Sequence, residues 1–432
     1  MPAEQPPILT DEFKDALALL ESKPATRPLI FITGRAGTGK TTLLKYFAQH
    51  TAQNVVVLAT TGLAAINVHG QTVHSFFRLK PGNLLDRNLL RRLPRKTVES
   101  FDTLIIDEAS MLRADLLDAL DHILQISTRC EEPFGGKQLI LFGDLFQLPP
   151  VEETEHSGLF DYFQARYKSP YFFDAQVFSR LPLEVFELKR IFRQRADKDY
   201  ASLLNAIREG RVSQPQLDSQ LNGRVSAETP AILENSILLA TTNQSAQWRN
   251  HSQLAQLPGQ EFVYTATADE TFTKTPPADR ELHLKKGAKI MMLVNSDNWV
   301  NGDIGTVHDL GPDFIQVELK GVVYEVQPHV WDEVRYEFNP LTQKLTPHVK
   351  GFFKQYPLKL AWAITVHKSQ GLTFENIYLD MGRGAFAPGQ TYVALSRCRT
   401  LAGVHLKRPI LTSDVQCDAR VQQFFDQVKG AR

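Results

Sequence analysis

The sequence predicts an α/β protein that contains two mostly parallel sheets. Short apolar runs of strand length alternate with stretches of helix length, and this alternation occurs in both halves of the chain. The runs in the first half are 29–33, 55–59, 103–106 and 138–142. Those in the second half are 183–188, 236–240, 361–365, 376–379 and 404–406. A length of 432 residues also leaves room for two or three domains.

The second half of the chain is predicted to contain an inserted β-barrel. Residues 281–350 alternate short strands with the turns Asn301-Gly302 and Gly311-Pro312. The second α/β domain then consists of 183–280 and 351–432, on either side of this insertion.

The first α/β domain is predicted to cover 1–182. It begins with a short helix that Thr10 caps. Residues 78–98 are strongly basic. A solvated helix face accounts for these charges about as well as a functional role does.

The composition limits the class of protein. The 48 basic residues balance the 48 acidic ones, so any contact with nucleic-acid phosphates must be local. Cys130, Cys398 and Cys417 form no C-x-x-C pair, which argues against a disulfide framework or a zinc site and favours a reducing compartment. The Pro-rich N-terminus has no apolar core, and no run approaches the roughly 18 apolar residues of a membrane span. We therefore expect a soluble, unexported protein of the cytoplasm, associated with the nucleoid if the source is bacterial.

A phosphate-binding loop is predicted at 34–41, between the apolar run 29–33 and a helical stretch. Its sequence is Gly34-Arg35-Ala36-Gly37-Thr38-Gly39-Lys40-Thr41. Glycines let backbone N–H groups surround the phosphates, while Lys40 reaches the outer phosphates and the Thr41 hydroxyl can bind Mg²⁺. The residues expected to hold the nucleotide here are Gly37, Thr38, Gly39, Lys40, Thr41 and Thr42.

An acid pair is predicted beside this loop. Asp107 and Glu108 end the apolar run 103–106, and carboxylates at the carboxyl end of a parallel strand emerge at the edge where the P-loop lies. There Asp107 can hold Mg²⁺, and Glu108 can orient and deprotonate the attacking water. Two surface acids at a strand end are the alternative, which the neighbouring P-loop disfavours.

The ordered motifs of the chain resemble those of superfamily 1B DNA helicases, and specifically the petite-integration-frequency (Pif) helicase family. The matching segments, in the family's order, are 34–41, 59–65, 70–76, 107–111, 143–150, 192–194, 365–374 and 392–397. Pro133-Phe134-Gly135-Gly136 resembles the stretch that separates Pif helicases from RecD-like ones. The resemblance implies two RecA-like P-loop domains with ATP in their cleft, a wedge at 78–98 and an SH3-like β-barrel at 281–350.

The resemblance also implies roles in ATP hydrolysis, besides those of Lys40 and Glu108. Gln147 senses the γ-phosphate, and Gly371 lies between the DNA track and the nucleotide. Arg193 and Arg397 approach the γ-phosphate from the domain opposite the P-loop and meet the charge that grows there. Lys14 stands where relatives carry a glutamine that reads adenine, which leaves base selectivity open.

Ten residues are expected to contact single-stranded DNA, through phosphate donors and aromatic faces that accept any base. They are Thr61, Gly70, Thr72, His74, Phe76, Phe77, Asn243, His367, Lys368 and Ser369. For Phe76 and Phe77, a place in the hydrophobic core is an equally good interpretation.

The sequence thus predicts an ATP- and Mg²⁺-dependent 5′-to-3′ DNA helicase of genome maintenance. Its expected partners are single-stranded, forked and partial-duplex DNA, with G-quadruplex DNA and RNA–DNA hybrid as further candidates, and the free protein is expected to be monomeric. The alternatives are a RecD-like or phage-type helicase and a DNA-binding ATPase switch that does not translocate. A P-loop enzyme of another class, such as a kinase, would leave 70–77 and 365–371 without a purpose.

Overall fold

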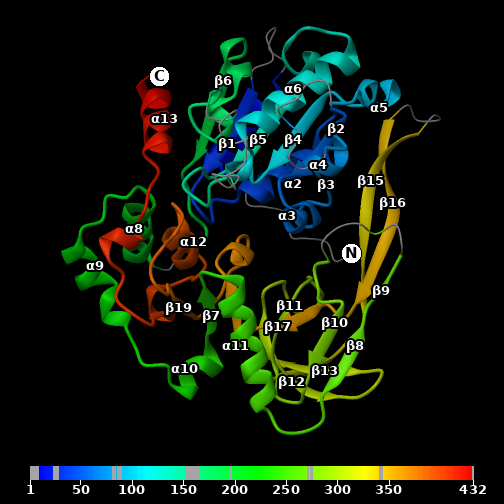
Figure 1. The fold of residues 1–432 in the computed structure, drawn as a ribbon. Coiled ribbons are helices and arrows are strands. Elements are labelled where there is room, and N and C mark those ends of the chain that lie inside the picture. The colour runs from blue at the N-terminus through cyan, green and yellow to red at the C-terminus, as the bar shows by residue number, and fades with distance from the viewer. Residues whose placement is uncertain are drawn as a thin grey trace. The chain divides into compact units, whose positions relative to one another are not determined.

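The computed structural model describes residues 9–22, 29–79, 84, 90–150, 163, 165–193, 197–269, 272, 276–339 and 344–430. The chain divides into two compact units. Among the described residues, the P-loop unit comprises those within 9–193, 334–349 and 418–430, and the second unit those within 197–333 and 350–417. Each unit contains a parallel sheet flanked by helices (Figure 1), which confirms the predicted α/β class.

The P-loop unit is built on a six-stranded parallel sheet of order β3-β2-β4-β5-β1-β6. Its strands are β1 (Leu29–Gly34), β2 (Val55–Ala59), β3 (Gln71–Thr72), β4 (Thr103–Asp107), β5 (Gln138–Gly143) and β6 (Leu183–Leu188). β1, β4 and β5 are buried along their whole length, because helices cover both faces of the sheet and leave no solvated side. This burial explains why the strands are unbroken apolar runs in the sequence.

Helices of the P-loop unit connect and cover these strands. They are α1 (Asp11–Glu21), α2 (Lys40–His50), α3 (Gly62–Asn67), α4 (Val73–Phe76), α5 (Arg95–Glu99), α6 (Ala114–Thr128) and α13 (Ala419–Gly430). Thr10 caps α1 by accepting from the Phe13 N–H group at 3.3 Å, as the sequence predicts. Phe13 and Phe47 pack with Ile30 in one core cluster, so α1 and α2 are held on the same core as β1.

The strand β6 corrects the predicted domain boundary at residue 183. β6 pairs with β1 in parallel, from Leu29 opposite Leu183 to Gly34 opposite Leu188, so it is the edge strand of the first sheet and not the start of the second domain. The apolar pattern identifies a strand at 183–188 correctly, but it contains no information about which sheet accepts that strand. The chain therefore stays with the P-loop unit as far as Arg193.

The C-terminal helix α13 corrects the same prediction at the other end of the chain, because it lies in the P-loop unit. The Phe424 ring stacks on Phe173 with ring centroids 4.4 Å apart. The Arg420 guanidinium donates to Asp174 at 2.8 Å. The buried Phe424 and Phe425 rings and the Arg420–Asp174 ion pair hold α13 in the P-loop unit. The residues just before it, up to Cys417, belong to the second unit.

The Pro133–Gly136 stretch forms a tight turn against α6. The Phe134 backbone N–H group donates to the Asp121 carboxylate at 2.6 Å, and Arg180 forms an ion pair with the same carboxylate. Gly135 has a φ of 60°, and a Cβ atom at this position would clash with Thr128 and with the Leu124 carbonyl. Only glycine fits this turn. The residues that mark the family resemblance are therefore structural ones.

The second unit contains a four-stranded parallel sheet of order β18-β7-β19-β20. The strands are β7 (Ile237–Ala240), β18 (Ala363–Thr365), β19 (Ile377–Asp380) and β20 (Val404–Leu406). The helices are α8 (Lys198–Arg208), α9 (Gln214–Gln220), α10 (Pro230–Asn235), α11 (Asn243–Gln256) and α12 (Gln390–Ser396).

Antiparallel strands occupy the part of the chain where a barrel is predicted. A five-stranded sheet has the order β14-β13-β12-β11-β17, and β8 pairs with β10 while β9 pairs with β16, which lies beside β15. The strands are β8 (Phe262–Thr265), β9 (Thr267–Ala268), β10 (Glu281–Leu284), β11 (Lys289–Met292), β12 (Ile304–Leu310), β13 (Ile315–Leu319), β14 (Val322–Val326), β15 (His329–Asn339), β16 (Lys344–Gln355) and β17 (Leu358–Leu360). β8 and β17 extend this antiparallel region beyond 281–350 on both sides, because each pairs with a strand inside that range.

Part of the basic insertion predicted at 78–98 lies outside the described residues, namely 80–83 and 85–89. Its described part includes α5. Nowhere in the described chain does a helix have both the length and the apolar character required to cross a membrane.

Candidate nucleotide and DNA sites

The predicted phosphate-binding loop joins β1 to α2. Gly37 and Gly39 have φ angles of 79° and 88°, the left-handed region that glycine adopts without strain. The Lys40 ammonium donates to the Gly34 carbonyl at 2.6 Å and to the Arg35 carbonyl at 3.1 Å, so it lies inside the curve of the loop. Thr41 and Thr42 are exposed in the first turn of α2, where backbone N–H groups lack intrahelical acceptors. The loop therefore has the groups that bind a polyphosphate.

Arg193 lies against this loop, in the same unit. The Phe192 N–H group donates to the Gly37 carbonyl at 2.8 Å, and a Cβ atom on Gly37 would collide with that of Arg193. The expectation that Arg193 comes from the domain opposite the P-loop is therefore wrong: since β6 pairs with β1, the chain that leaves β6 returns to the P-loop. Gln194, the last residue of the matching segment 192–194, lies outside the described residues.

Asp107 and Glu108 stand at the carboxyl end of β4. The Glu108 N–H group donates to the Asp107 carboxylate at 2.9 Å, and the Thr60 hydroxyl donates to the Glu108 carbonyl at 3.1 Å. Glu108 itself has a φ of 53°, so its backbone turns sharply out of the strand. Burial, followed by repulsion from Glu108, raises the pKa of Asp107 to about 7, although the charge of Lys40 acts in the opposite direction.

Gln147 follows β5, the strand between β4 and β1. Its N–H group donates to the carbonyl of the buried Asp144 at 2.9 Å. A Cβ atom on Gly143 would lie 3.0 Å from the Ala109 nitrogen, so the segment after β5 packs directly on the segment after β4. The order β4-β5-β1 thus brings the acid pair, Gln147 and the P-loop to one edge of one sheet.

An aromatic contact next to Gln147 was not predicted from the sequence. The Phe146 ring, next to Gln147, stacks on Phe425 of α13 with centroids 5.2 Å apart and planes 14° apart. The amphipathic pattern of α13 predicts a packed helix, but no pattern in the sequence indicates that its partner is 279 positions away (425 − 146).

If Asp107 is a Mg²⁺ ligand, as the sequence predicts, its raised pKa makes Mg²⁺·nucleotide binding depend on pH. Below pH 7 the Asp107 carboxyl is mostly protonated in the metal-free protein. Since Mg²⁺ binds only the ionised carboxylate, a proton must leave, and the affinity should fall about tenfold for each pH unit below 7. Titration calorimetry with Mg²⁺·ADP between pH 5.5 and 8, in buffers of different ionisation enthalpy, measures both the affinity and the proton released. Asp107→Asn should bind Mg²⁺·ADP weakly and without this proton release, and wild-type affinity that stays flat from pH 8 to 5.5 would contradict the assignment.

The candidate DNA residues of the P-loop unit have structural roles of their own. Thr61 and Thr72 cap α3 and α4 by accepting from the N–H groups of Ala64 and Ser75, at 3.2 and 3.3 Å. Gly70 packs so close to the Val57 carbonyl that a Cβ atom would overlap it. Burial lowers the pKa of His74, another candidate of this unit, so its ring is neutral at pH 7.

Phe76 and Phe77 are core residues in this structure. The Phe77 side chain is only 2% exposed, and its ring packs edge-on against Phe76, with centroids 5.1 Å apart. Phe76 in turn contacts Phe101 at 6.1 Å. The alternative interpretation from the sequence, a place in the core, is the one that the structure shows. A base-stacking role for these two rings is not compatible with their burial.

The candidate DNA residues of the second unit gather around the ends of β7 and β18. Asn243 is exposed at the start of α11, and His367 and Lys368 are exposed just after β18. Ser369 is fully buried, and its hydroxyl donates to the Val366 carbonyl at 2.7 Å, so it shapes the turn that presents His367 and Lys368.

Two neighbours of this group were not identified from the sequence. The Phe386 side chain is 61% exposed, and its ring stacks on His367 with centroids 6.2 Å apart. Lys359, in β17, lies near Lys368, and burial together with that second ammonium lowers the pKa of Lys359 to about 8. An exposed aromatic residue in the glycine-rich segment 382–389 is the signal that could have identified Phe386.

Arg397 is buried inside the second unit, with only 2% of its surface exposed. Its guanidinium donates to the carbonyls of Ser369 and Leu372, each at 3.4 Å, and to the Ser396 hydroxyl at 2.9 Å. The two carbonyls flank Gly371, which has a φ of 78°. Arg397, which directly follows α12, thus connects that helix to the turn at 369–372. No periodicity in the sequence predicts this buried position for an arginine.

Comparisons with known proteins match almost all of the chain. A family model described as PIF1-like helicase matches residues 8–218. The ATP-dependent DNA helicases PIF1 of rat and human are 31% and 32% identical over the whole chain, which spans 66% and 65% of their lengths. A crystal structure of Bacteroides sp Pif1 in complex with ADP-AlF4 is 34% identical, with 98% of each chain covered and a TM-score of 0.87. One of Bacteroides Pif1 bound to ssDNA is 33% identical with the same coverage and a TM-score of 0.70.

Proposed function

Because the chain belongs to the PIF1-like helicase family, we propose that it is an ATP-dependent DNA helicase that moves 5′ to 3′ along single-stranded DNA and separates duplex ahead of it. The observation that carries the proposal is the shared sheet edge of the P-loop unit, where Lys40, the acid pair and Gln147 meet. This is the set of groups that phosphoryl transfer to water requires. The names of the relatives support DNA as the partner.

In the proposed nucleotide site, each residue acts from the position described above. Lys40 exchanges its bonds to the Gly34 and Arg35 carbonyls for the outer phosphates of ATP. Glu108 orients the attacking water and accepts its proton. Gln147 contacts the γ-phosphate, and Arg193, already against the P-loop, meets the negative charge that grows there.

The Thr41 hydroxyl and the Asp107 carboxylate would hold Mg²⁺. Both are hard oxygen ligands of the kind this ion prefers, and Thr41 is exposed at the helix start that receives the phosphates. When bound, the ion neutralises charge on the phosphate oxygens. The high pKa of Asp107 supports the assignment, because a buried carboxylate of this kind is stabilised by a cation.

The proposed DNA track combines neutral side chains with a small number of cations. Partial desolvation by neighbouring groups lowers the pKa of both His74 and His367, so at pH 7 they offer neutral rings and hydrogen bonds. Lys368, with Lys359 beside it, supplies the cations for phosphate in the second unit. Thr61, Thr72 and Asn243 complete the track, whereas Gly70 and Ser369 shape the backbone around it.

We propose that the free protein is a monomer and that G-quadruplex DNA is a further substrate.

Arg397 is proposed to link the nucleotide to the DNA track. Its bonds to the Ser369 and Leu372 carbonyls are long, at 3.4 Å, and therefore weak enough to be exchanged for phosphate oxygens. Such an exchange would free the backbone around Gly371 next to Lys368. Binding and release of the triphosphate would then alter the grip on DNA.

An unwinding assay tests this proposal. Duplexes with a 5′ single-stranded tail, a 3′ tail or blunt ends are incubated with the protein, Mg²⁺ and ATP, and strand separation is followed by fluorescence. We expect rapid unwinding of the 5′-tailed duplex only, and none with Glu108→Gln or without ATP. Preference for the 3′ tail would refute the direction. DNA-dependent ATP hydrolysis without unwinding of any duplex would favour a switch that does not translocate.

A further inference from the structure

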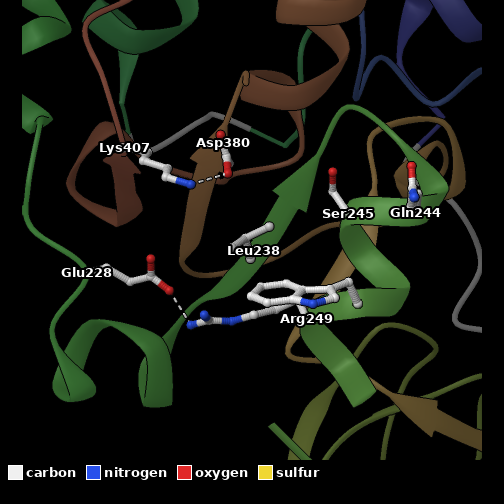
Figure 2. Close-up of a pocket in the computed structure, with 8 residues that line it drawn as sticks. Glu228, Leu238, Gln244, Ser245, Arg249, Asp380 and Lys407 are labelled. Atoms are coloured by element: carbon white, nitrogen blue, oxygen red, sulfur yellow. Dashed lines mark hydrogen bonds and ion pairs between the residues drawn. The ribbon is translucent and has the colours of Figure 1, made fainter. Parts of the chain in front are cut away.

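A pocket of about 540 Å³ lies in the second unit, beside α11. It is lined by Leu238 of β7, by Asp380 at the end of β19 and by Gln244, Ser245 and Trp248 of α11 (Figure 2). None of these residues belongs to the nucleotide site or the DNA track described above. Its volume falls within the range of pockets that bind small planar molecules.

Trp248 is the feature that distinguishes this pocket. Its side chain is 67% exposed, whereas the other three tryptophans, all in the described chain, are at least partly buried. Trp299 packs edge-on against Tyr324, and Trp331 lies 5.9 Å from the Phe353 ring. A single exposed apolar residue is common on protein surfaces, but an exposed indole at the edge of a hollow offers a flat face to a ligand.

The charges around the pocket are paired. Lys407 donates to Asp380 at 2.6 Å, and Arg249 forms an ion pair with Glu228, as the dashed lines in Figure 2 show. Two cations thus face two carboxylates, so the pocket does not attract an isolated phosphate. It suits instead an uncharged planar ligand whose edge carries both hydrogen-bond donors and acceptors.

The position of the pocket indicates where such a ligand comes from. Asn243, a proposed DNA contact, is the first residue of α11, and Gln244 and Ser245 follow it directly. Gln244 follows Asn243 directly and lies four residues before Trp248, so the Gln244 and Trp248 side chains share one face of α11, about 6 Å apart along the helix axis. A strand that passes Asn243 therefore carries a base to within reach of the indole.

We propose that this pocket is a base-binding subsite for single-stranded DNA, in which one unpaired base stacks on Trp248 and presents its edge to Gln244 and Asp380. The inference rests on the proposed function, because it requires a DNA strand at Asn243. Stacking on an aromatic face accepts any base, as a helicase without sequence preference needs. The phosphates remain outside the pocket, where the carboxylates of Glu228 and Asp380 do not repel them.

Equilibrium binding of labelled oligothymidylates, each with one abasic position, tests the subsite. Wild type, Trp248→Ala, Trp248→Phe and the control Gln247→Ala are compared at one salt concentration. Gln247 is exposed on the same helix but does not line the pocket. We expect Trp248→Ala to weaken binding roughly 5- to 150-fold, the range for loss of one base stack, with Trp248→Phe between it and wild type and Gln247→Ala unchanged.

The abasic positions give the decisive comparison. For wild type, the oligothymidylate whose abasic position faces Trp248 should bind more weakly than the intact strand, by the same factor as the Trp248→Ala substitution causes. For Trp248→Ala, this oligothymidylate and the intact strand should bind equally well. Equal affinity of wild type and Trp248→Ala, or the same abasic profile in both, would overturn the subsite and leave the pocket to another class of ligand, such as a peptide. DNA-stimulated ATP hydrolysis by wild type is measured in parallel, because its absence would count against the proposed function itself.

Discussion

Lys40→Ala is expected to lower DNA-stimulated ATP hydrolysis by at least about 100-fold and to abolish unwinding, while binding of single-stranded DNA is kept. The Lys40 ammonium donates to two carbonyls of the phosphate-binding loop, those of Gly34 and Arg35. Its loss removes the cation that would meet the outer phosphates. The proposed DNA residues lie outside 34–41, so the affinity for DNA should change little.

Steady-state hydrolysis and fluorescence anisotropy on the same preparations measure these two effects. Glu108→Gln is the matched comparison, because it should bind ATP as well as wild type does and still fail to hydrolyse it. A Lys40→Ala protein that unwinds DNA at more than a few per cent of the wild-type rate would remove this loop from the mechanism.

Arg397→Ala is expected to lower the turnover of ATP by about 10³-fold or more, the effect of losing an arginine that stabilises the transferring phosphoryl group. Arg397 is buried and donates to the carbonyls of Ser369 and Leu372, so its removal also leaves these acceptors unsatisfied. Thermal unfolding must therefore be measured together with kcat. Arg397→Lys keeps the charge but not the planar fork, and we expect it to recover stability better than turnover.

Arg399→Ala is the matched control for this prediction. Arg399 lies two residues further along, its side chain is 54% exposed, and it pairs with Glu375 at the surface. We expect no change in turnover or stability from its removal. An Arg397→Ala protein that unfolds at a lower temperature but retains near-normal kcat would show that Arg397 is structural only.

The fold class and the P-loop edge could be predicted from the sequence because local patterns determine them. β1 and β4 are buried on both faces and therefore appear as apolar runs, and the loop that follows β1 needs glycines at Gly37 and Gly39 for its backbone angles. The place of the acid pair could be predicted for the same reason, since Asp107 is the last residue of the apolar strand β4.

Other features depend on pairing between distant segments, which local patterns do not contain. β6 is recognisable as a strand, but its partner β1 lies about 150 residues away, and this pairing places Arg193 in the P-loop unit. The packing of Phe425 on Phe146 is of the same kind. Phe76 and Phe77 show a different limit: the residue type is compatible with both a core and a DNA face, and only packing around Phe101 decides.

The measurement that tests the account most directly is the rate of ATP hydrolysis at saturating concentrations of oligothymidylate of increasing length. If cleavage of ATP at the P-loop moves the chain along a strand, each binding event on a longer strand supports more cycles, and the rate should rise with length before it levels off. A rate that DNA does not stimulate, or that is the same for every strand long enough to bind, would contradict that claim.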